Sequence, residues 1–246
     1  MTETIPLDPA LDHLREHLPT AIEGRDPEGV HQVRVAARRL GVWLELAERR
    51  ALVGDLRWLR GVAGEVRDLD VLTMLDLPER LSRDLVSKRT AAHAQLVVEL
   101  EGPRCVGLLN ALEQLQPLSA RRASKGVVRL FELVRRRGRR VDRVRKSSTA
   151  QRTRLHALRR ASRRLRYARE WIGERDRRLK RLQSTLGQLN DLDQLQRRLT
   201  LITDRELLDD FARELAVRTD EAQIDALAAW RACRGELLAE FAGRRA

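Results

Sequence analysis

Two segments of the sequence place a histidine and three arginines at one shared spacing, HxxRxxxRRL. Guanidinium groups donate paired hydrogen bonds to phosphate oxygens, and an imidazole can donate one more. The pattern therefore indicates a site for phosphate-bearing anions. The residues of the two copies are His31, Arg34, Arg38 and Arg39, then His156, Arg159, Arg163 and Arg164.

Both copies predict amphipathic helices, because successive residues of a helix turn by about 100°. His31, Arg34 and Arg38 share one face of the first helix. We expect its opposite face in the core, namely Val33, Ala36, Ala37, Leu40, Leu44 and Ala47. The second helix has a polar face of His156, Arg159, Arg160, Arg163 and Tyr167, opposed by Leu158, Ala161, Leu165 and Ile172.

Like charges four residues apart weaken an isolated helix. Arg34 and Arg38 are such a pair, and no acid lies within 31–44 or 156–168. A solvated charged face is the simplest explanation of each stripe. Because the stripe recurs in both halves, we favour a second explanation, in which the arginines stay unpaired until an external polyanion neutralises them.

A second pair of segments repeats at nearly the same offset. Residues 59–70 align with 182–193, so that Asp68 and Asp70 match Asp191 and Asp193. This order of matches predicts an internal duplication. Paired carboxylates can hold Mg²⁺, but residues two apart on a helix point in different directions. Capping or ion pairing with arginine is the favoured role.

The charge of the chain is uneven. The 246 residues carry 49 Lys and Arg against 36 Asp and Glu, a net charge of +13. Residues 121–182 hold 25 basic and 5 acidic residues, which indicates an acidic partner. Within them Arg136 and Arg140 share a predicted helix face with Arg129 and Arg143; a further binding surface and an exposed linker helix are equally good interpretations.

Apolar residues recur at helical spacing and no strand-like alternation is evident, so the fold class is predicted to be all-α. Two cysteines do not make a disulfide framework, and no apolar run is long enough to span a membrane. A cytoplasmic protein is expected. The predicted helices cover 8–23, 29–50, 53–76, 79–100, 104–116, 119–146, 151–173, 175–202, 204–218 and 220–243.

Four ordered motifs resemble the CHAD family, the conserved-histidine α-helical domain. They are VHQVRVAARRL (30–40), LRGVAGEVRDLDVL (59–72), LHALRRASRRLRY (155–167) and LKRLQSTLGQLNDLDQL (179–195). The resemblance implies one domain over 1–246, built as two pseudo-symmetric antiparallel helical bundles (about 7–117 and 118–246). It also implies binding of inorganic polyphosphate and association with polyphosphate granules.

Carried over by position, the resemblance places both HxxRxxxRRL copies at the binding surface. It adds Arg166 and Tyr167 from the third motif, and Gly41 stands where the first motif commonly has a basic residue. Residues that extend the surface are Arg57, Arg60, Arg67, Lys180 and Arg181. The CYTH module that often accompanies this domain is not evident.

Other functions remain as alternatives. Nucleic acid is the main one, although aromatic residues make up only 3% of the chain and stacking platforms are therefore scarce. A polyphosphate-metabolising enzyme is the other, but no phosphate loop or nucleophile constellation is present. We therefore expect a non-enzymatic protein without a cofactor. No metal site is expected at the motif histidines, because cations surround both of them. Granule-associated proteins are further candidate partners, nucleic acid a weaker competitor, and no membrane is expected.

Overall fold

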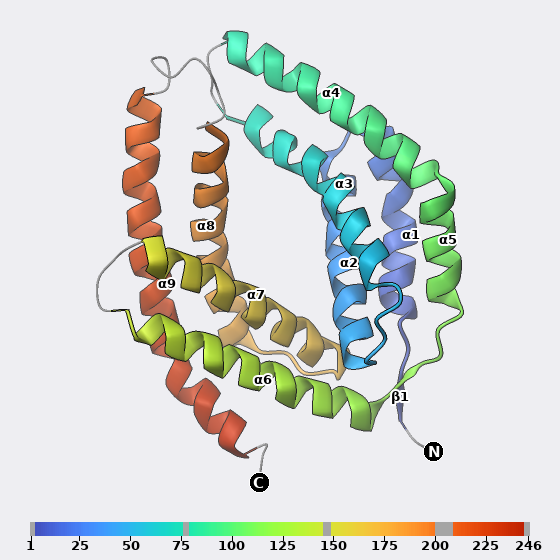
Figure 1. Ribbon diagram of the computed structural model, residues 1–246, viewed down its shortest axis with the longest axis vertical. Helices are drawn as coiled ribbons and strands as arrows, with labels where there is room; N and C mark the ends of the chain where they lie inside the picture. The colour runs from blue at the N-terminus through green and yellow to red at the C-terminus, as the bar shows by residue number, and fades with distance from the viewer. Residues whose placement is uncertain (1–2, 76–78, 145–148, 200–208, 244–246) are drawn as a thin grey trace. The chain divides into compact units, whose positions relative to one another are not determined.

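The computed structural model describes residues 3–75, 79–144, 149–199 and 209–243 (Figure 1). Within these ranges the chain is almost entirely helical, which confirms the all-α prediction. A short pair of antiparallel strands, β1 (Thr4–Ile5) and β2 (Leu118–Ser119), was not expected from the sequence. The chain divides into two compact units, Met1–Ala123 and Ser124–Ala246.

Five consecutive helices lie in the described part of the first unit. In it α1 packs against α2, α2 against α3, and α3 against α4, while α5 contacts α1, α3 and α4. Their bounds are α1 (Asp8–Glu23), α2 (Pro27–Leu46), α3 (Val53–Thr73), α4 (Glu79–Glu101) and α5 (Pro103–Glu113).

Local sequence signals set the turn between α1 and α2. Gly24 ends α1 in the left-handed region, at φ 68°, where a side chain is disfavoured. Asp26 caps α2 by accepting from the Glu28 N–H at 2.8 Å, and Pro27 follows as the first helical residue. Gly29 lets the helices approach, because a Cβ there would lie 2.6 Å from Ala21 N.

The apolar face predicted for the first motif lies in the core of this unit. All six of its residues are buried, which confirms that prediction. Trp43 is buried beside them, and its Nε1 donates to the Ile5 carbonyl oxygen at 3.2 Å. The first-motif helix is therefore held with its basic face turned away from the core.

The described part of the second unit contains four helices, although α6 begins a few residues before it. They are α6 (Ala120–Asp142), α7 (Thr149–Trp171), α8 (Arg177–Leu199) and α9 (Asp209–Gly243). The predicted break between 218 and 220 is wrong, because no Gly or Pro interrupts the pattern there. Thr219 is instead buried within α9 and donates to the Leu215 carbonyl oxygen. The helix limits predicted at 76, 146, 202 and 204 lie outside the described residues.

Close packing joins α6 to α9. Gly138 faces Trp230 so tightly that a Cβ would lie 1.9 Å from the indole ring. The Trp230 Nε1–H donates to Asp142 at 3.1 Å. On α7, Leu158, Ala161 and Leu165 are buried as predicted.

Two residues predicted on the helix that carries the third motif differ from expectation. Ile172 is only half-buried, because α7 ends one residue before it. Tyr167, predicted on the polar face, is buried at 6% exposure, and the Arg166 guanidinium lies 4.5 Å from the centre of its ring. No helix among the described residues has both the length and the apolar character needed to cross a membrane.

A buried ion network closes the C-terminal end of α7. Arg169 is 8% exposed and pairs with Glu174 at 3.0 Å, Asp176 at 2.9 Å and Glu240 at 2.9 Å. Arg178, at the start of α8, pairs with two of these acids, Asp176 and Glu240. A buried arginine requires such compensation, so these contacts fix the connection between α7 and α8 against α9.

Candidate anion-binding sites

In the first unit, predicted site residues from two helices lie close enough to repel one another. We name this group the α2–α3 cluster. It consists of His31, Arg34 and Arg38 from α2 and Arg57, Arg60 and Arg67 from α3. The structure thus brings together six of the seven residues predicted for this half, while Arg39 is turned about 100° around α2 from Arg38.

Arg34 lies at the centre of the α2–α3 cluster. Its Nη1 donates to the Arg60 carbonyl oxygen at 2.7 Å, which ties α2 to α3. Gly64 makes room for it, since a Cβ there would lie 2.3 Å from Nη1. Burial, followed by repulsion from Arg38, lowers the pKa of Arg34 to about 10, with Asp68 acting in the opposite direction. Arg34 is still a cation at neutral pH.

His31 is kept neutral by the same surroundings. Burial lowers its pKa below 6.5, and the charges of Arg67, Arg38 and Arg34 add to this effect, partly offset by Glu28. A negatively charged ligand would remove the repulsive contribution. His31 therefore becomes easier to protonate when an anion binds.

Several cations of the α2–α3 cluster have no carboxylate partner. Among the described residues, Arg38, Arg57 and Arg67 form no ion pair. Asp70, at the end of the second motif, does not reach them: it is 3% exposed and pairs with Arg89 of α4 at 3.0 Å. The predicted ion pairing of this aspartate is confirmed.

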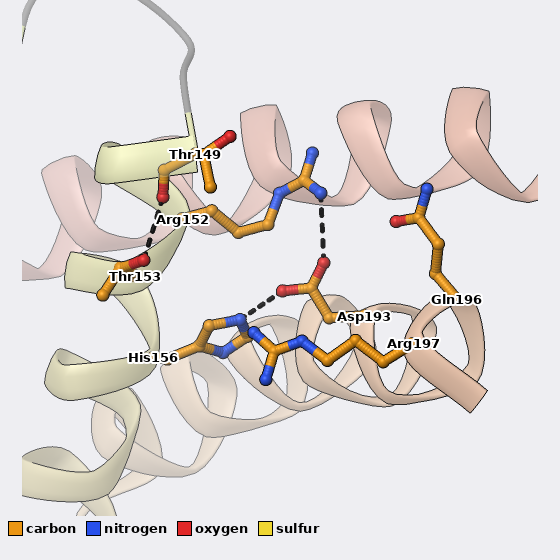
Figure 2. A pocket seen from close by; sticks show the side chains of 7 residues that line it. All are labelled: Thr149, Arg152, Thr153, His156, Asp193, Gln196 and Arg197. Atoms are coloured by element: carbon orange, nitrogen blue, oxygen red, sulfur yellow. Dashed lines mark hydrogen bonds and ion pairs between the residues drawn. The ribbon is translucent and has the colours of Figure 1, made fainter. Parts of the chain in front are cut away.

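In the second unit, the corresponding histidine lines a pocket between α7 and α8 (Figure 2). The pocket has a volume of about 280 Å³, just below the range of about 300–1,000 Å³ for drug-sized ligands. It suits a small anion or a short stretch of a linear one. We name it the α7–α8 pocket. The residues that line it are Thr149, Arg152, Thr153, His156, Asp193, Gln196 and Arg197.

Asp193 organises this pocket from a buried position on α8. One of its oxygens bonds His156 Nε2, and the other pairs with Arg152 at 3.2 Å (Figure 2). Arg152 also pairs with Asp220 at 2.8 Å and donates to Gln223 at 3.0 Å, both on α9. A single aspartate thus holds an imidazole and a guanidinium at the pocket wall, as predicted for its ion-pairing role.

The expectation that the second basic stripe stays unpaired is wrong. No acid lies within 156–168, but α8 supplies two: Asp193 reaches His156, and Asp191 lies 4.0 Å from Arg159. Arg152 and Asp193 were not among the predicted site residues. Arg152 could have been found, because it precedes His156 by four residues and so shares its helix face.

The other residues predicted for this half are distributed around α7 and α8. Arg166 donates to Gln183 at 2.7 Å and pairs with Glu170 at 2.6 Å. Arg163 and Arg164 are half-buried and have interaction partners. Residues that are exposed to solvent are Arg160, Lys180 and Arg181.

On α6, Arg136 and Arg140 are both exposed. The Arg140 carbonyl oxygen accepts from Arg154 Nη1 at 2.8 Å, which links α6 to α7. No contact among the described residues joins either α6 side chain to the α7–α8 pocket. The two interpretations of this helix, further surface or exposed linker, therefore both stand.

Comparison with protein families decides the class of this fold. The model of the CHAD domain matches residues 6–200. The chain belongs to the CHAD domain family. The crystal structure of the CHAD domain from the plant Ricinus communis is similar at a TM-score of 0.65 and 25% identity, covering 100% of this chain and 94% of that one.

A second solved structure shares the fold. PptA from Streptomyces chartreusis is similar at a TM-score of 0.63 and 17% identity, covering 96% of this chain and 99% of that one. Comparison with curated proteins gave no match. The predicted CHAD fold is confirmed over the full length of the chain.

Proposed function

We propose that this CHAD domain binds inorganic polyphosphate without chemically changing it. The observation that carries the proposal is the α2–α3 cluster, in which burial, together with repulsion between neighbouring cations, lowers the pKa values of His31, Arg34 and Arg60. Gathering like charges costs free energy. A ligand with closely spaced negative charges removes that cost and gains charge-assisted hydrogen bonds.

The chemistry of the cluster suits a linear polyanion without bases. Polyphosphate presents anionic oxygens along its whole length and has no base edges or rings to recognise. The one tyrosine among the predicted site residues is buried under Arg166 and offers no stacking face. Nucleic acids gain much of their single-strand affinity from such faces, so polyphosphate is the better candidate.

The non-enzymatic part of the proposal rests on the paired aspartates. Asp70 and Asp193, one from each predicted pair, are both buried and paired with an arginine, so neither carboxylate is exposed to Mg²⁺ in solvent. We expect polyphosphate to remain intact when it is incubated with the protein and Mg²⁺. Release of inorganic phosphate or formation of a nucleoside triphosphate would overturn this part alone.

Charge reversal within the cluster tests the binding site. Arg38→Glu/Arg67→Glu removes two cations that make no ion pair among the described residues, so the fold should persist. Losing two charge-assisted contacts should weaken binding roughly 100-fold. Fluorescence anisotropy with labelled polyphosphate measures this. The control Arg83→Glu/Arg218→Glu changes net charge equally, on the exposed faces of α4 and α9.

The outcomes separate the candidate ligands. Polyphosphate should compete better than DNA at matched phosphate and salt concentrations, and its affinity should fall steeply with salt. Equal competition would favour the nucleic-acid alternative, and equal loss in the control would mean non-specific attraction. In cells, we propose that the protein lies in the cytoplasm on polyphosphate granules with other granule proteins, which a fluorescent fusion tests.

A further inference from the structure

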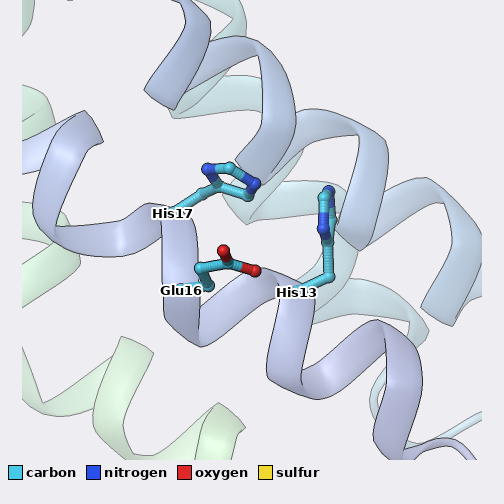
Figure 3. Close-up of side chains that lie close together, drawn as sticks. All are labelled: His13, Glu16 and His17. Atoms are coloured by element: carbon cyan, nitrogen blue, oxygen red, sulfur yellow. The ribbon is translucent and has the colours of Figure 1, made fainter.

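Helix α1 carries two histidines and a glutamate outside the sites described above (Figure 3). His13, Glu16 and His17 lie three and four residues apart, so they project from one side of the helix. One imidazole nitrogen of each histidine and one carboxylate oxygen lie within 4.8 Å of one another. The ring centroids are 4.5 Å apart, at an interplanar angle of 72°.

A hydrogen bond from the neighbouring helix orients one of the rings. His13 Nε2 lies 2.9 Å from Gln32 Oε1, and Gln32 Nε2 donates to Glu28 on the same helix. Because the Gln32 amide nitrogen is directed to Glu28, its oxygen faces His13 and accepts the Nε2–H. The lone pair of His13 therefore lies on Nδ1. Histidines that bind metal typically have their second nitrogen fixed in this way.

The local charge on α1 favours a cation. The helix contains four acids, Asp8, Asp12, Glu16 and Glu23, against one arginine. That arginine, Arg15, pairs with Glu113 at 3.2 Å. In a chain of net charge +13, four acids against one arginine give this helix a net charge of −3. The histidines are half-buried and Glu16 is exposed, so the three groups remain accessible from solvent.

We propose that His13, Glu16 and His17 form a Zn²⁺ site on α1, with water as the remaining ligand. Two imidazoles and one carboxylate are a donor set that zinc accepts in tetrahedral geometry, whereas Mg²⁺ and Ca²⁺ prefer oxygen donors alone. The HxxEH spacing also places two histidines on one helix face in known zinc proteins. The inference is independent of polyphosphate binding.

Zinc titration of the untagged, full-length protein in competition with a chromogenic chelator tests the site. Polyphosphate must be absent, because it binds divalent cations itself. We expect one Zn²⁺ per chain. His17→Gln should weaken binding at least about 100-fold, since it removes a ligand, and Gln32→Ala about tenfold, since it removes the contact that orients His13. Asp12→Asn, an exposed acid on the same helix, is the matched control and should bind as the parent does.

A second measurement separates loss of the site from loss of the fold. Zinc should raise the melting temperature of the parent and of Asp12→Asn but not that of His17→Gln, because only a bound ion stabilises the folded state. The proposal fails if the parent binds no zinc. It also fails if folded His17→Gln binds zinc like the parent, or if His156→Gln is the variant that abolishes binding.

Discussion

The two histidine motifs have the same residue types but different neighbours. His31 lies among arginines of α2 and α3 and makes no hydrogen bond to a carboxylate among the described residues. His156 is held by Asp193, which also binds Arg152. Repulsion between cations thus persists around His31, whereas the charge around His156 is partly neutralised by Asp193.

The origin of this difference can be traced to one position. At the offset of 125 residues that relates the motifs, Arg152 corresponds to Pro27. Proline begins α2 and carries no charge, so the first copy lacks this arginine. Asp70, which aligns with Asp193, pairs instead with Arg89 of α4 and makes no hydrogen bond to His31 among the described residues. A duplicated motif therefore does not guarantee duplicated chemistry.

Removing Asp193 should have the largest effect on this comparison. Asp193→Ala leaves Arg152 without its buried counter-charge, which should cost about 3–5 kcal/mol of unfolding free energy. Urea denaturation measures the loss. Asp191→Ala is the control, because Asp191 is 74% exposed and its removal should change stability by only about 0.5 kcal/mol. Equal losses in both variants would contradict the organising role of Asp193.

Replacing the two histidines should give unequal losses of stability. His156→Gln disrupts a hydrogen bond to a buried carboxylate and should cost about 1–3 kcal/mol. His31→Gln removes no hydrogen bond among the described residues and should stay within about 0.5 kcal/mol. The same denaturation experiment compares them. A larger loss of unfolding free energy in His31→Gln than in His156→Gln would contradict the difference described between the two motifs.

The pH dependence of polyphosphate binding should come from the first motif. The pKa of free His31 lies below 6.5, and a bound anion raises it, so binding takes up a proton. Affinity should therefore increase as pH falls from 8 toward 6, by up to about tenfold. His31→Gln should flatten the profile. A flat profile in the parent would exclude this role.

The smallest expected effect concerns Gly64 and Gly187, which align in the sequence repeat. Substitution by alanine should change stability differently at the two positions. Gly187 of α8 has open space beside it, so Gly187→Ala should stabilise the helix by about 0.5–1 kcal/mol. At Gly64 the new Cβ would meet Arg34 and displace it from the Arg60 carbonyl oxygen. Gly64→Ala should bring no such gain and should alter polyphosphate affinity, whereas Gly187→Ala should leave affinity unchanged.

Much of the fold could be predicted from the sequence because its helices follow local signals. Apolar spacing located α2 and its buried face, and Gly24 and Pro27 mark its boundary with α1. The β1–β2 pair could not be predicted, since two residues are too few for a periodic pattern. The break predicted near 219 is wrong because α9 continues through Thr219, which is buried and donates to the Leu215 carbonyl oxygen.

Periodicity predicted the site only where its residues lie on one helix, whereas the α3 arginines followed from the family resemblance. His31, Arg34 and Arg38 share a face, and periodicity is enough to find them. The pairing of His156 with Asp193 depends on how α7 packs on α8. The sequence of α7 alone does not reveal that packing. The HxxEH spacing of His13, Glu16 and His17 was readable, but its link to Gln32 again required the packing of two helices.

The small strand pair has a consequence for how the first unit could be rebuilt. Thr4 pairs with Ser119 and Ile5 with Leu118, so segments more than a hundred residues apart meet at one edge. The Trp43 Nε1–H donates to the Ile5 carbonyl oxygen and so ties β1 to α2. A short designed linker could join these adjacent segments, and new termini could then be opened in a loop elsewhere, giving a circular permutant of this unit that keeps its helices.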